Sequence, residues 1–183
     1  MESVKTPEFL TVLGETFYVQ KLLGKGKGGY SYLVIGARGK KYVLKQIHHE
    51  PCDYYSFPPD KLGCEVRAYG LLRDLGIPVP KLIAVDLAED RLLKEYIPGY
   101  TVDVLVKKNA MKPEIYHQIQ DICHKLYDAN LNIDYYPTNF VVRHNGKMYY
   151  IDYECNEYTD QWNYENWGSK YWYKTPEFEA AFK

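Results

Sequence analysis

The sequence lacks both the long apolar run of a membrane-spanning protein and the charge excess of a nucleic-acid-binding protein. No apolar stretch approaches the roughly 20 residues that a membrane-spanning helix needs. Residues 1–9 lack a basic region followed by an apolar stretch, so we expect no signal peptide. The formal net charge is −1. No strong field of one sign is therefore present, which argues against nucleic acid or an anionic membrane as a partner.

Cysteine is scarce and widely spaced. The four cysteines form no CxxC pair and no metal-ligand spacing. Because 46% of the 183 residues are hydrophobic, the chain can build a core without disulfides. We therefore expect a single folded domain in the cytoplasm with reduced thiols. The cysteines are Cys52, Cys64, Cys123 and Cys155.

The first half of the sequence predicts a small antiparallel sheet and one helix. Short segments rich in β-forming residues are separated by glycine, proline or tight turns. The predicted strands are residues 17–23, 30–37, 40–47, 80–87 and 91–97. Residues 48–59 have no periodicity and predict a loop. Asp60 is a suitable N-cap for a helix that continues to about Leu75, with apolar residues at steps of three and four.

The second half is predominantly helical. A short helix is predicted from Thr101 or Asp103, and a longer one from Pro113, which suits a first helical position. Asn145–Gly146 lies between two apolar runs and predicts a hairpin. A further short helix is predicted near residues 176–182. The fold class expected from both halves is α+β.

A glycine-rich segment, Gly24 to Gly29, separates the first two predicted strands and contains the string GxGxxG. Dinucleotide-binding folds use the same string, but there the third glycine opens a helix, whereas here a strand follows. Glycines between two strands allow backbone N–H groups to approach phosphates. An ordinary glycine-rich hairpin is the alternative interpretation.

Lys45 and Glu65 are charged residues in otherwise apolar surroundings. Lys45 follows Val43 and Leu44 in the third predicted strand, where a lysine is ordinarily solvated. Glu65 lies 20 residues later on the predicted helix. The order and distance match the lysine–glutamate pair of protein kinases, in which the lysine holds the α- and β-phosphates.

Two further polar motifs follow the long predicted helix. Asp134 and Asn139 have the Asp-x-x-x-x-Asn spacing of a kinase catalytic loop. Asp152 follows the next apolar strand, at the place of the metal-binding aspartate of Asp-Phe-Gly. Two hard oxygen ligands suit Mg²⁺, which takes few protein ligands in addition to phosphate oxygens. Taken singly, each aspartate is equally compatible with a turn cap.

In order and spacing, these elements resemble the protein-kinase-like superfamily over roughly residues 17–155. The chain is similar to small atypical members: Rio kinases, bacterial lipopolysaccharide kinases and short bacterial probable serine/threonine kinases. The resemblance implies a bilobal fold. Its N-lobe, about residues 1–95, would hold five antiparallel strands and one helix. A hinge at 95–99 would lead to a reduced, mainly helical C-lobe at 100–183.

The resemblance also implies roles for individual residues, with ATP and Mg²⁺ as cofactors. The implied nucleotide-binding residues are Gly24, Gly26, Gly29, Lys45, Glu95 and Ile97. Among them, Glu95 would offer its carbonyl and Ile97 its amide to adenine, and Glu65 would hold Lys45. Asp134 would act as catalytic base, and Asn139 and Asp152 would bind the metal.

The sequence departs from the kinase pattern at several positions. Asn132 and Ile133 replace the His-Arg that precedes the catalytic aspartate, which makes control by activation-loop phosphorylation doubtful. Tyr136 replaces a lysine that lies near the γ-phosphate in protein kinases, and Glu154 replaces the glycine of Asp-Phe-Gly. Only 31 residues follow Asp152 in this sequence, so we expect a C-lobe without the peptide-binding helices of a full kinase.

The aromatic residues of the last segment have two interpretations. They can cover the C-lobe core in place of the missing helices, or they can form a surface for a partner protein. The residues are Trp162, Tyr164, Trp167, Tyr171, Trp172 and Tyr173. Thr175-Pro176-Glu177 resembles the Ala-Pro-Glu motif that ends an activation segment, although Thr6-Pro7-Glu8 repeats the tripeptide elsewhere.

The expected function is transfer of the ATP γ-phosphoryl group to a hydroxyl acceptor, with serine or threonine of a protein as the expected acceptor. Two alternatives remain open. One is a small-molecule kinase that acts on a sugar or a lipid headgroup. The other is a nucleotide-binding pseudokinase that scaffolds a partner protein.

Overall fold

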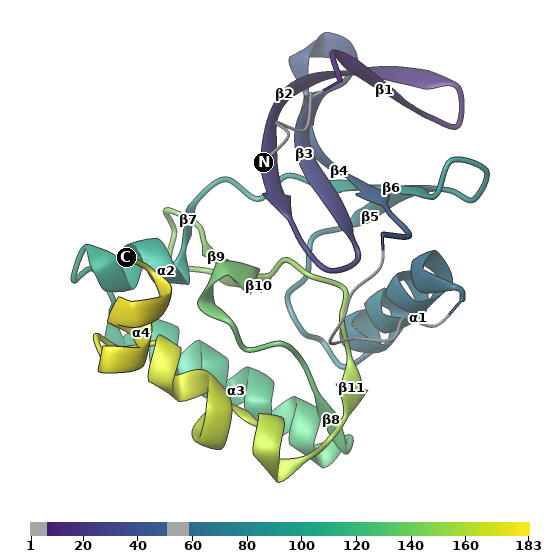
Figure 1. Ribbon diagram of the computed structural model, residues 1–183. Coiled ribbons are helices and arrows are strands. Elements are labelled where there is room, and N and C mark those ends of the chain that lie inside the picture. The colour runs from purple at the N-terminus through teal and green to yellow at the C-terminus, as the bar shows by residue number, and fades with distance from the viewer. Residues whose placement is uncertain (1–6, 51–58) are drawn as a thin grey trace. The chain divides into compact units, whose positions relative to one another are not determined.

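The computed structural model describes residues 7–50 and 59–183, and its fold is mixed α+β (Figure 1). The chain divides into two compact units. The first comprises the described residues of Met1–Val66 and Pro80–Tyr96, and the second comprises Arg67–Val79 and Ile97–Lys183. In the described part of the chain, no helix is both long and apolar enough to span a membrane.

A six-stranded antiparallel sheet forms most of the first unit, in the order β1-β2-β3-β4-β6-β5. The strands are β1 Phe9–Val12, β2 Glu15–Lys25, β3 Gly29–Ile35, β4 Lys41–Ile47, β5 Leu82–Asp86 and β6 Arg91–Glu95. A short 3₁₀ turn, Ala37–Gly39, connects β3 and β4. Val34 and Leu44 are fully buried, and with Leu93 they form the centre of the core of this unit. All five predicted strands are present.

The prediction of five strands is nevertheless wrong by one, because β1 adds a sixth. It pairs with β2 through a two-residue turn at Leu13 and Gly14, in which φ is +50° and +82°. Two positive φ values are typical of the tight turns of β-hairpins. Leucine is rarely found in this left-handed region. Of the two turn residues, only Gly14 is therefore of a type that signals a turn in the sequence.

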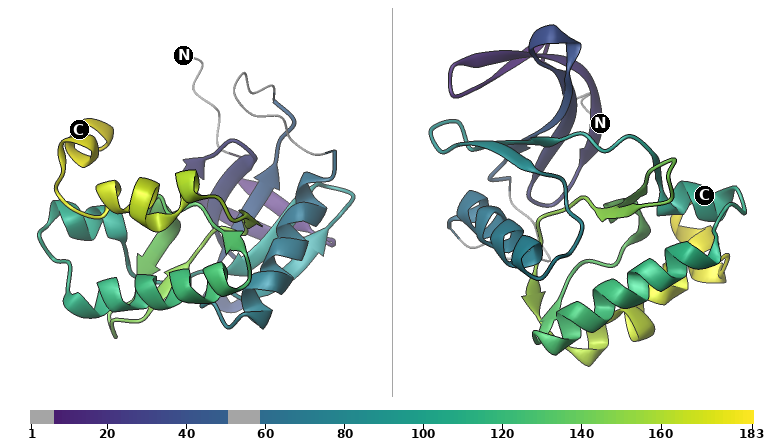
Figure 2. Two further views of the ribbon diagram at one scale, coloured as in Figure 1. Left: turned by 90° about the horizontal axis from the view of Figure 1, so that it is seen from below. Right: turned by 180° about the vertical axis from the view of Figure 1, so that it is seen from behind.

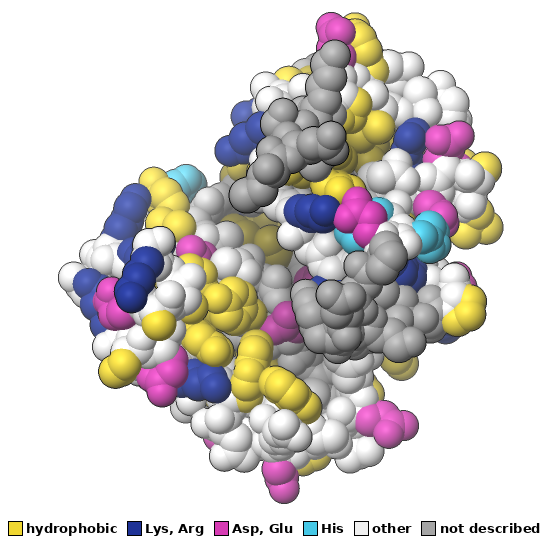
Figure 3. Space-filling model, viewed as in Figure 1, with side chains coloured by type: hydrophobic (Ala, Val, Ile, Leu, Met, Phe, Trp, Pro, Cys, Tyr) yellow, Lys and Arg dark blue, Asp and Glu magenta, His cyan; other side chains and the backbone are white. Residues whose placement is uncertain are grey.

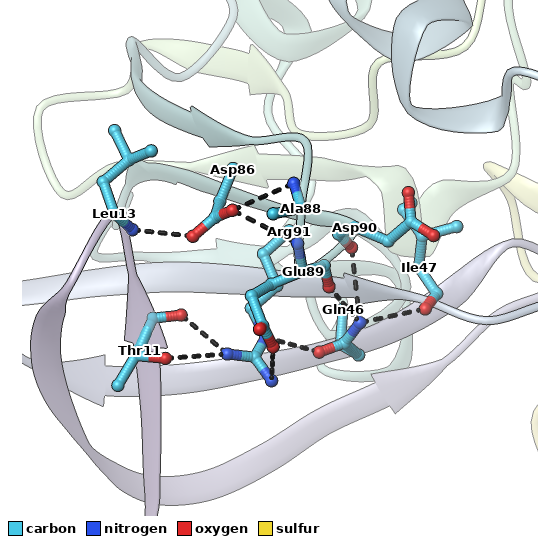
Figure 4. A network of polar contacts seen from close by, with 9 residues as sticks. All are labelled: Thr11, Leu13, Gln46, Ile47, Asp86, Ala88, Glu89, Asp90 and Arg91. Atoms are coloured by element: carbon cyan, nitrogen blue, oxygen red, sulfur yellow. Dashed lines mark hydrogen bonds and ion pairs between the residues drawn. The ribbon is translucent and has the colours of Figure 1, made fainter.

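Polar contacts connect β1 to the opposite edge of the curled sheet (Figure 4). Asp86, at the end of β5, accepts a 2.7 Å hydrogen bond from the backbone N–H of Leu13. Arg91 of β6 donates a 2.8 Å hydrogen bond to the carbonyl of Thr11 and also bonds Gln46. These contacts stabilise the curled sheet from edge to edge.

Helix α1, Lys61–Asp74, begins in the first unit and ends in the second. Asp60 caps it as predicted: its Oδ1 accepts a 2.9 Å hydrogen bond from the N–H of Gly63. Such a cap satisfies one of the backbone donors that a helix leaves free at its first turn. Most of the predicted loop before Asp60 lies outside the described residues.

The second unit contains three further helices and two small sheets. The helices are α2 Val102–Lys107, α3 Pro113–Asp128 and α4 Pro176–Ala181. The strands are β7 Tyr100–Thr101, β8 Leu131–Asn132, β9 Phe140–Val142, β10 Met148–Tyr150 and β11 Asn156–Glu157. One sheet has the order β10-β9-β7, and β8 pairs with β11. All three predicted helices are confirmed, as is the hairpin at Asn145–Gly146.

Short helical turns complete the second unit. They are Pro137–Asn139, Asp160–Trp162 and Ser169–Tyr171, with a π-helical turn at Tyr164–Gly168. The last three belong to the aromatic segment, which runs alongside α3 in each view (Figures 1 and 2). Trp172 is completely buried, and Tyr164 is 8% exposed. These side chains therefore belong to the core of the second unit, as the first interpretation of the aromatic segment predicts.

The Thr175-Pro176-Glu177 motif marks the start of α4. The Thr175 hydroxyl accepts a hydrogen bond from the N–H of Phe178, and Pro176 occupies the first helical position. Phe178 is 1% exposed and is anchored in the core. The local physics of an N-cap therefore accounts for this tripeptide.

Candidate functional site

The glycine segment forms the end of the β2–β3 hairpin in the first unit. The N–H of Gly26 donates a 2.9 Å hydrogen bond to the carbonyl of Gly29 and closes the turn. A Cβ on Gly29 would lie only 2.6 Å from the carbonyl oxygen of Gln46 on β4. By contrast, a Cβ on Gly24 would meet no atom of the described residues within 4 Å. Strand packing therefore requires a glycine at 29 but not at 24.

Lys45 of β4 and Glu65 of α1 form an ion pair. Their Nζ and Oε1 atoms are 2.6 Å apart, and each side chain is only 13% exposed. Lys45 is therefore not a solvated surface lysine. Because β4 lies between β3 and β6 within the sheet, its backbone position is held by hydrogen-bonded neighbours on both sides. The sequence-predicted pair is thus brought together by a central strand and the first turns of a capped helix.

Glu95 and Ile97 flank the point where the chain passes from the first unit to the second. Glu95 ends β6, and its N–H donates a 2.9 Å hydrogen bond to the carbonyl of Lys81. Ile97 is 5% exposed. Within the described parts of the chain, no residue accepts a hydrogen bond from its N–H. The N–H of a residue as buried as Ile97 normally has a partner, so this amide is suited to a ligand or a bound water.

Asp134 lies in the second unit, between β8 and the 3₁₀ turn at Pro137–Asn139. Its Oδ1 accepts a 3.0 Å hydrogen bond from the N–H of Tyr136, and its carbonyl accepts one from the Asn139 amide. The side chain is held by its own loop, as in a turn cap. This contact orients the carboxylate and is compatible with a second role for its other oxygen.

A backbone hydrogen bond joins the segments that carry Asn139 and Asp152. The N–H of Ile151 donates to the carbonyl of Asn139 at 2.8 Å. Asp152, the next residue, accepts a 2.9 Å hydrogen bond from the N–H of Tyr153. The side-chain nitrogen of Asn139 donates to the backbone carbonyl of Asp134. This bond leaves the side-chain oxygen of Asn139 as an acceptor. The two sequence-predicted metal ligands are therefore held on adjoining segments.

Tyr150 lies among the carboxylates of this region. Its side chain is completely buried, and its hydroxyl donates a 3.1 Å hydrogen bond to the carbonyl of Glu154. Burial raises its pKa well above the usual value, and the negative charges of Asp152, Glu154 and Asp134 raise it further. The electrostatic effect indicates that these three carboxylates act on one small region of the second unit.

The side chains of Asn139 and Asp152 offer hard oxygen donors. Across residues 7–50 and 59–183, no three His, Cys, Asp or Glu side chains form a cluster that would hold a metal. Carboxylate and amide oxygens are the ligands that Mg²⁺ prefers, and it commonly completes its shell with phosphate oxygens and water. Asn139 and Asp152 fit that donor set.

Trp172 and Gly168 support the Asp134 loop through Tyr135, but neither belongs to the sequence-predicted site. Tyr135 is completely buried, and its carbonyl accepts a 2.8 Å hydrogen bond from the indole of Trp172. Gly168 packs so closely on Tyr135 that a Cβ there would lie 2.6 Å from the tyrosine Cβ. Nothing in local spacing signals these contacts, because they join residues more than 30 positions apart.

Comparison with known proteins shows a distant similarity. No protein-family model matches the chain. The chain is 26% identical, over 163 residues, to the probable bifunctional tRNA threonylcarbamoyladenosine biosynthesis protein of Methanocaldococcus jannaschii. The match covers 80% of this chain but only 29% of the archaeal protein. The chain therefore corresponds to less than a third of that relative's length.

Proposed function

We propose that this chain is a kinase-like phosphotransferase that uses ATP and Mg²⁺, with a serine or threonine hydroxyl of a protein as acceptor. Lys45, held by Glu65, would bind the nucleotide phosphates. Asn139 and Asp152 would bind the metal, and Asp134 would act as general base. We place this activity in the cytoplasm.

The Lys45–Glu65 ion pair is the observation that carries the proposal. Removing two charges from water is costly, and such a pair seldom increases stability over apolar residues of similar size. The 2.6 Å contact and the 13% exposure of each side chain therefore favour a functional explanation. A lysine placed by a glutamate is the arrangement that kinases use to hold α- and β-phosphates.

The glycine segment gives independent support for phosphate binding. Among the described residues, a Cβ on Gly24 would meet no atom within 4 Å, and one on Gly26 would make only an ordinary 3.9 Å contact with the Gly29 carbonyl oxygen. Packing among these residues therefore does not explain why both positions are glycine. A phosphate that approaches the backbone closely would explain it, because a Cβ would obstruct that approach. The amide of Ile97, for which the described residues provide no acceptor, would likewise donate a hydrogen bond to an adenine nitrogen.

The proposed reaction is an in-line transfer. The acceptor oxygen forms a bond to the γ-phosphorus while the bond from that phosphorus to the β–γ bridging oxygen breaks, and ADP leaves. The acceptor proton passes to Asp134. Asn139 and Asp152 would hold a metal ion, which would neutralise the charge that develops on the phosphate oxygens. Tyr136 replaces the usual catalytic lysine, so we expect slow turnover.

The archaeal similarity is compatible with this proposal but does not specify the acceptor. That protein is described as bifunctional, and the chain matches 29% of it, as a chain related to one of its two functions would. We do not include tRNA binding in the proposal for this chain, because a net charge of −1 gives no excess of positive charge to attract nucleic acid.

The test measures transfer from γ-labelled ATP with Mg²⁺ to the chain itself, to a generic protein and to a panel of small hydroxyl compounds. Asp134→Asn and Lys45→Met are the test variants. Asp128→Asn, at the exposed end of α3, and Lys41→Met, exposed on the same strand as Lys45, are matched controls. We expect label transfer by the wild type and both controls and its loss, at least about 100-fold, in both test variants.

Each alternative has its own outcome. Turnover that occurs only with small hydroxyl compounds replaces the protein kinase by a small-molecule kinase. ATP binding that depends on Lys45, with no transfer to any acceptor, replaces the enzyme by a nucleotide-binding scaffold. Absence of ATP binding to the wild type refutes the kinase-like function altogether.

A further inference from the structure

Tyr136 lies at the centre of a group of partly exposed aromatic rings in the second unit. Its ring centroid is 5.1 Å from that of Tyr171, 5.3 Å from Phe182 and 6.2 Å from Trp167. Trp167 and Tyr171 are also in contact, at 5.6 Å. We call these four residues the ring cluster. Its members come from the Asp134 loop and from the last 17 residues of the chain.

The ring cluster is not part of the closed core. Trp172 and Phe178, its neighbours in sequence, are at most 1% exposed, whereas all four members of the cluster keep part of their surface in solvent. Figure 3 shows hydrophobic side chains gathered on the face of the second unit that carries α2 and α4. Accessible aromatic rings beside a candidate catalytic loop are a feature of ligand sites.

A buried carboxylate accompanies the ring cluster. Asp103 of α2 is 9% exposed. Its Oδ1 is completely buried and has no hydrogen-bond partner among the residues that the structure describes. Buried polar atoms are normally paired, and a buried carboxylate oxygen without a partner is costly. This free-energy cost would be relieved by a partner that does not belong to the chain.

Asp103 lies on the helix face that meets the ring cluster. Lys107, four residues later and hence on the same face of α2, has its Nζ 5.4 Å from the ring centroid of Phe182. Phe182 in turn stacks on Tyr136. Burial raises the pKa of Tyr136, and the charge of Asp103 adds to this effect after that of Tyr171. The carboxylate therefore acts on the ring at the centre of the cluster.

Two ordinary explanations for Asp103 are insufficient. An acidic residue in the first turn interacts favourably with the helix dipole, but an exposed residue suffices, as Glu114 of α3 shows. Neutralisation by Lys107 would explain the burial. However, no ion pair between Asp103 and Lys107 is present in the described residues, and the lysine lies over Phe182 instead.

We propose that Asp103 and the ring cluster bind a cationic nitrogen of the acceptor, an ammonium or guanidinium group located near the hydroxyl that receives the phosphoryl group. A cation satisfies the carboxylate and is attracted to the faces of aromatic rings. Tyr136 connects the two functions, since its backbone N–H donates to Asp134 while its ring forms the cluster. This inference rests on the proposed function for the transfer step, but the binding step stands alone.

A cationic nitrogen near a hydroxyl can come from two kinds of acceptor. One is a small amino alcohol or amino sugar, and the other is a peptide with a lysine or arginine beside a serine. The probes are therefore matched pairs that differ in charge. Glucosamine is compared with N-acetylglucosamine, and ethanolamine with ethylene glycol. A serine peptide with two preceding arginines is compared with the same peptide containing alanines.

The first measurement is binding without nucleotide, followed by tryptophan fluorescence. The second is label transfer from ATP with Mg²⁺. We expect the charged member of one pair to bind about tenfold more tightly than its uncharged partner. Asp103→Asn should abolish this preference. Glu114→Gln, which removes an exposed first-turn carboxylate, is the matched control and should retain it. The pair that shows the preference identifies the source of the cation.

The outcomes separate this inference from the proposed function. Equal binding and equal transfer for charged and uncharged probes overturn the inference while transfer itself supports the kinase. Asp103-dependent binding of a charged probe with no transfer to any acceptor supports the inference and overturns the kinase. If Asp103→Asn does not fold, the matched pairs on the wild type still decide, because they need no variant.

Discussion

The indole nitrogen of Trp172 donates a 2.8 Å hydrogen bond to the carbonyl of Tyr135, the residue that follows Asp134. Both side chains are completely buried. A residue near the end of the chain thus holds the backbone of the candidate catalytic loop. The stability of the second unit and the geometry of its candidate site therefore depend on the same contact.

Trp172→Phe should reduce both stability and phosphoryl transfer. The variant keeps an aromatic ring but leaves the buried Tyr135 carbonyl without its donor, which should cost about 1–3 kcal/mol in the free energy of unfolding. Urea denaturation measures this change. Trp162→Phe is the control, because Trp162 is 50% exposed and its replacement should change stability by less than about 0.5 kcal/mol. Equal effects of the two changes would contradict the role of the Trp172 contact.

Gly24→Ala and Gly29→Ala should affect different properties. A Cβ at position 29 would lie 2.6 Å from the Gln46 carbonyl oxygen, so this change should destabilise the fold by about 1–3 kcal/mol. A Cβ at position 24 would meet no atom of residues 7–50 and 59–183 within 4 Å. Gly24→Ala should therefore leave the melting temperature nearly unchanged but weaken ATP binding by about tenfold, as measured by calorimetry. Unchanged affinity in Gly24→Ala would argue against phosphate binding at this hairpin.

Asp86 should make stability depend on pH. The hydrogen bond from the Leu13 N–H is the largest cause that lowers its pKa in the folded protein, below the value of about 3.9 of an unfolded chain. Its contribution is thus fully present above about pH 4 and is lost as the pH falls through the folded pKa. Chemical denaturation from pH 7 to pH 3 measures this loss.

Asp86→Asn should be less stable than the wild type at pH 7, and the difference should shrink below about pH 4. Asp74→Asn is the control, because that side chain is 69% exposed and pairs with Arg73 at the surface. A constant difference between wild type and Asp86→Asn across the whole pH range would contradict the assignment.

Asp152→Asn should weaken the response to Mg²⁺ rather than the fold. Replacing a carboxylate by an amide removes a charge from a ligand of a hard cation, so the Mg²⁺ concentration for half-maximal ATP binding should rise about tenfold. Titration of Mg²⁺ against a fluorescent ATP analogue measures this concentration. Glu157→Gln, exposed on β11, is the control. An unchanged Mg²⁺ requirement in Asp152→Asn would remove this residue from the metal site.

Local sequence signals predicted most of the elements. Asp60, Pro113 and the Asn145–Gly146 turn each mark a boundary through backbone physics that operates over a few residues. The missed strands are β1, whose turn places leucine in a left-handed conformation, and three two-residue strands. Pairing of such short segments depends on distant partners and leaves no periodicity to detect.

The sequence by itself determined the order of the charged motifs and the strands, loops and helix that carry them. It did not determine which charges are buried or what they contact. The 2.6 Å approach of Lys45 to Glu65, the support of Tyr135 by Trp172 and the burial of Asp103 were decided by the tertiary structure. Each joins residues far apart in the chain or depends on the packing around them, so each follows from the way complete elements pack rather than from local preference.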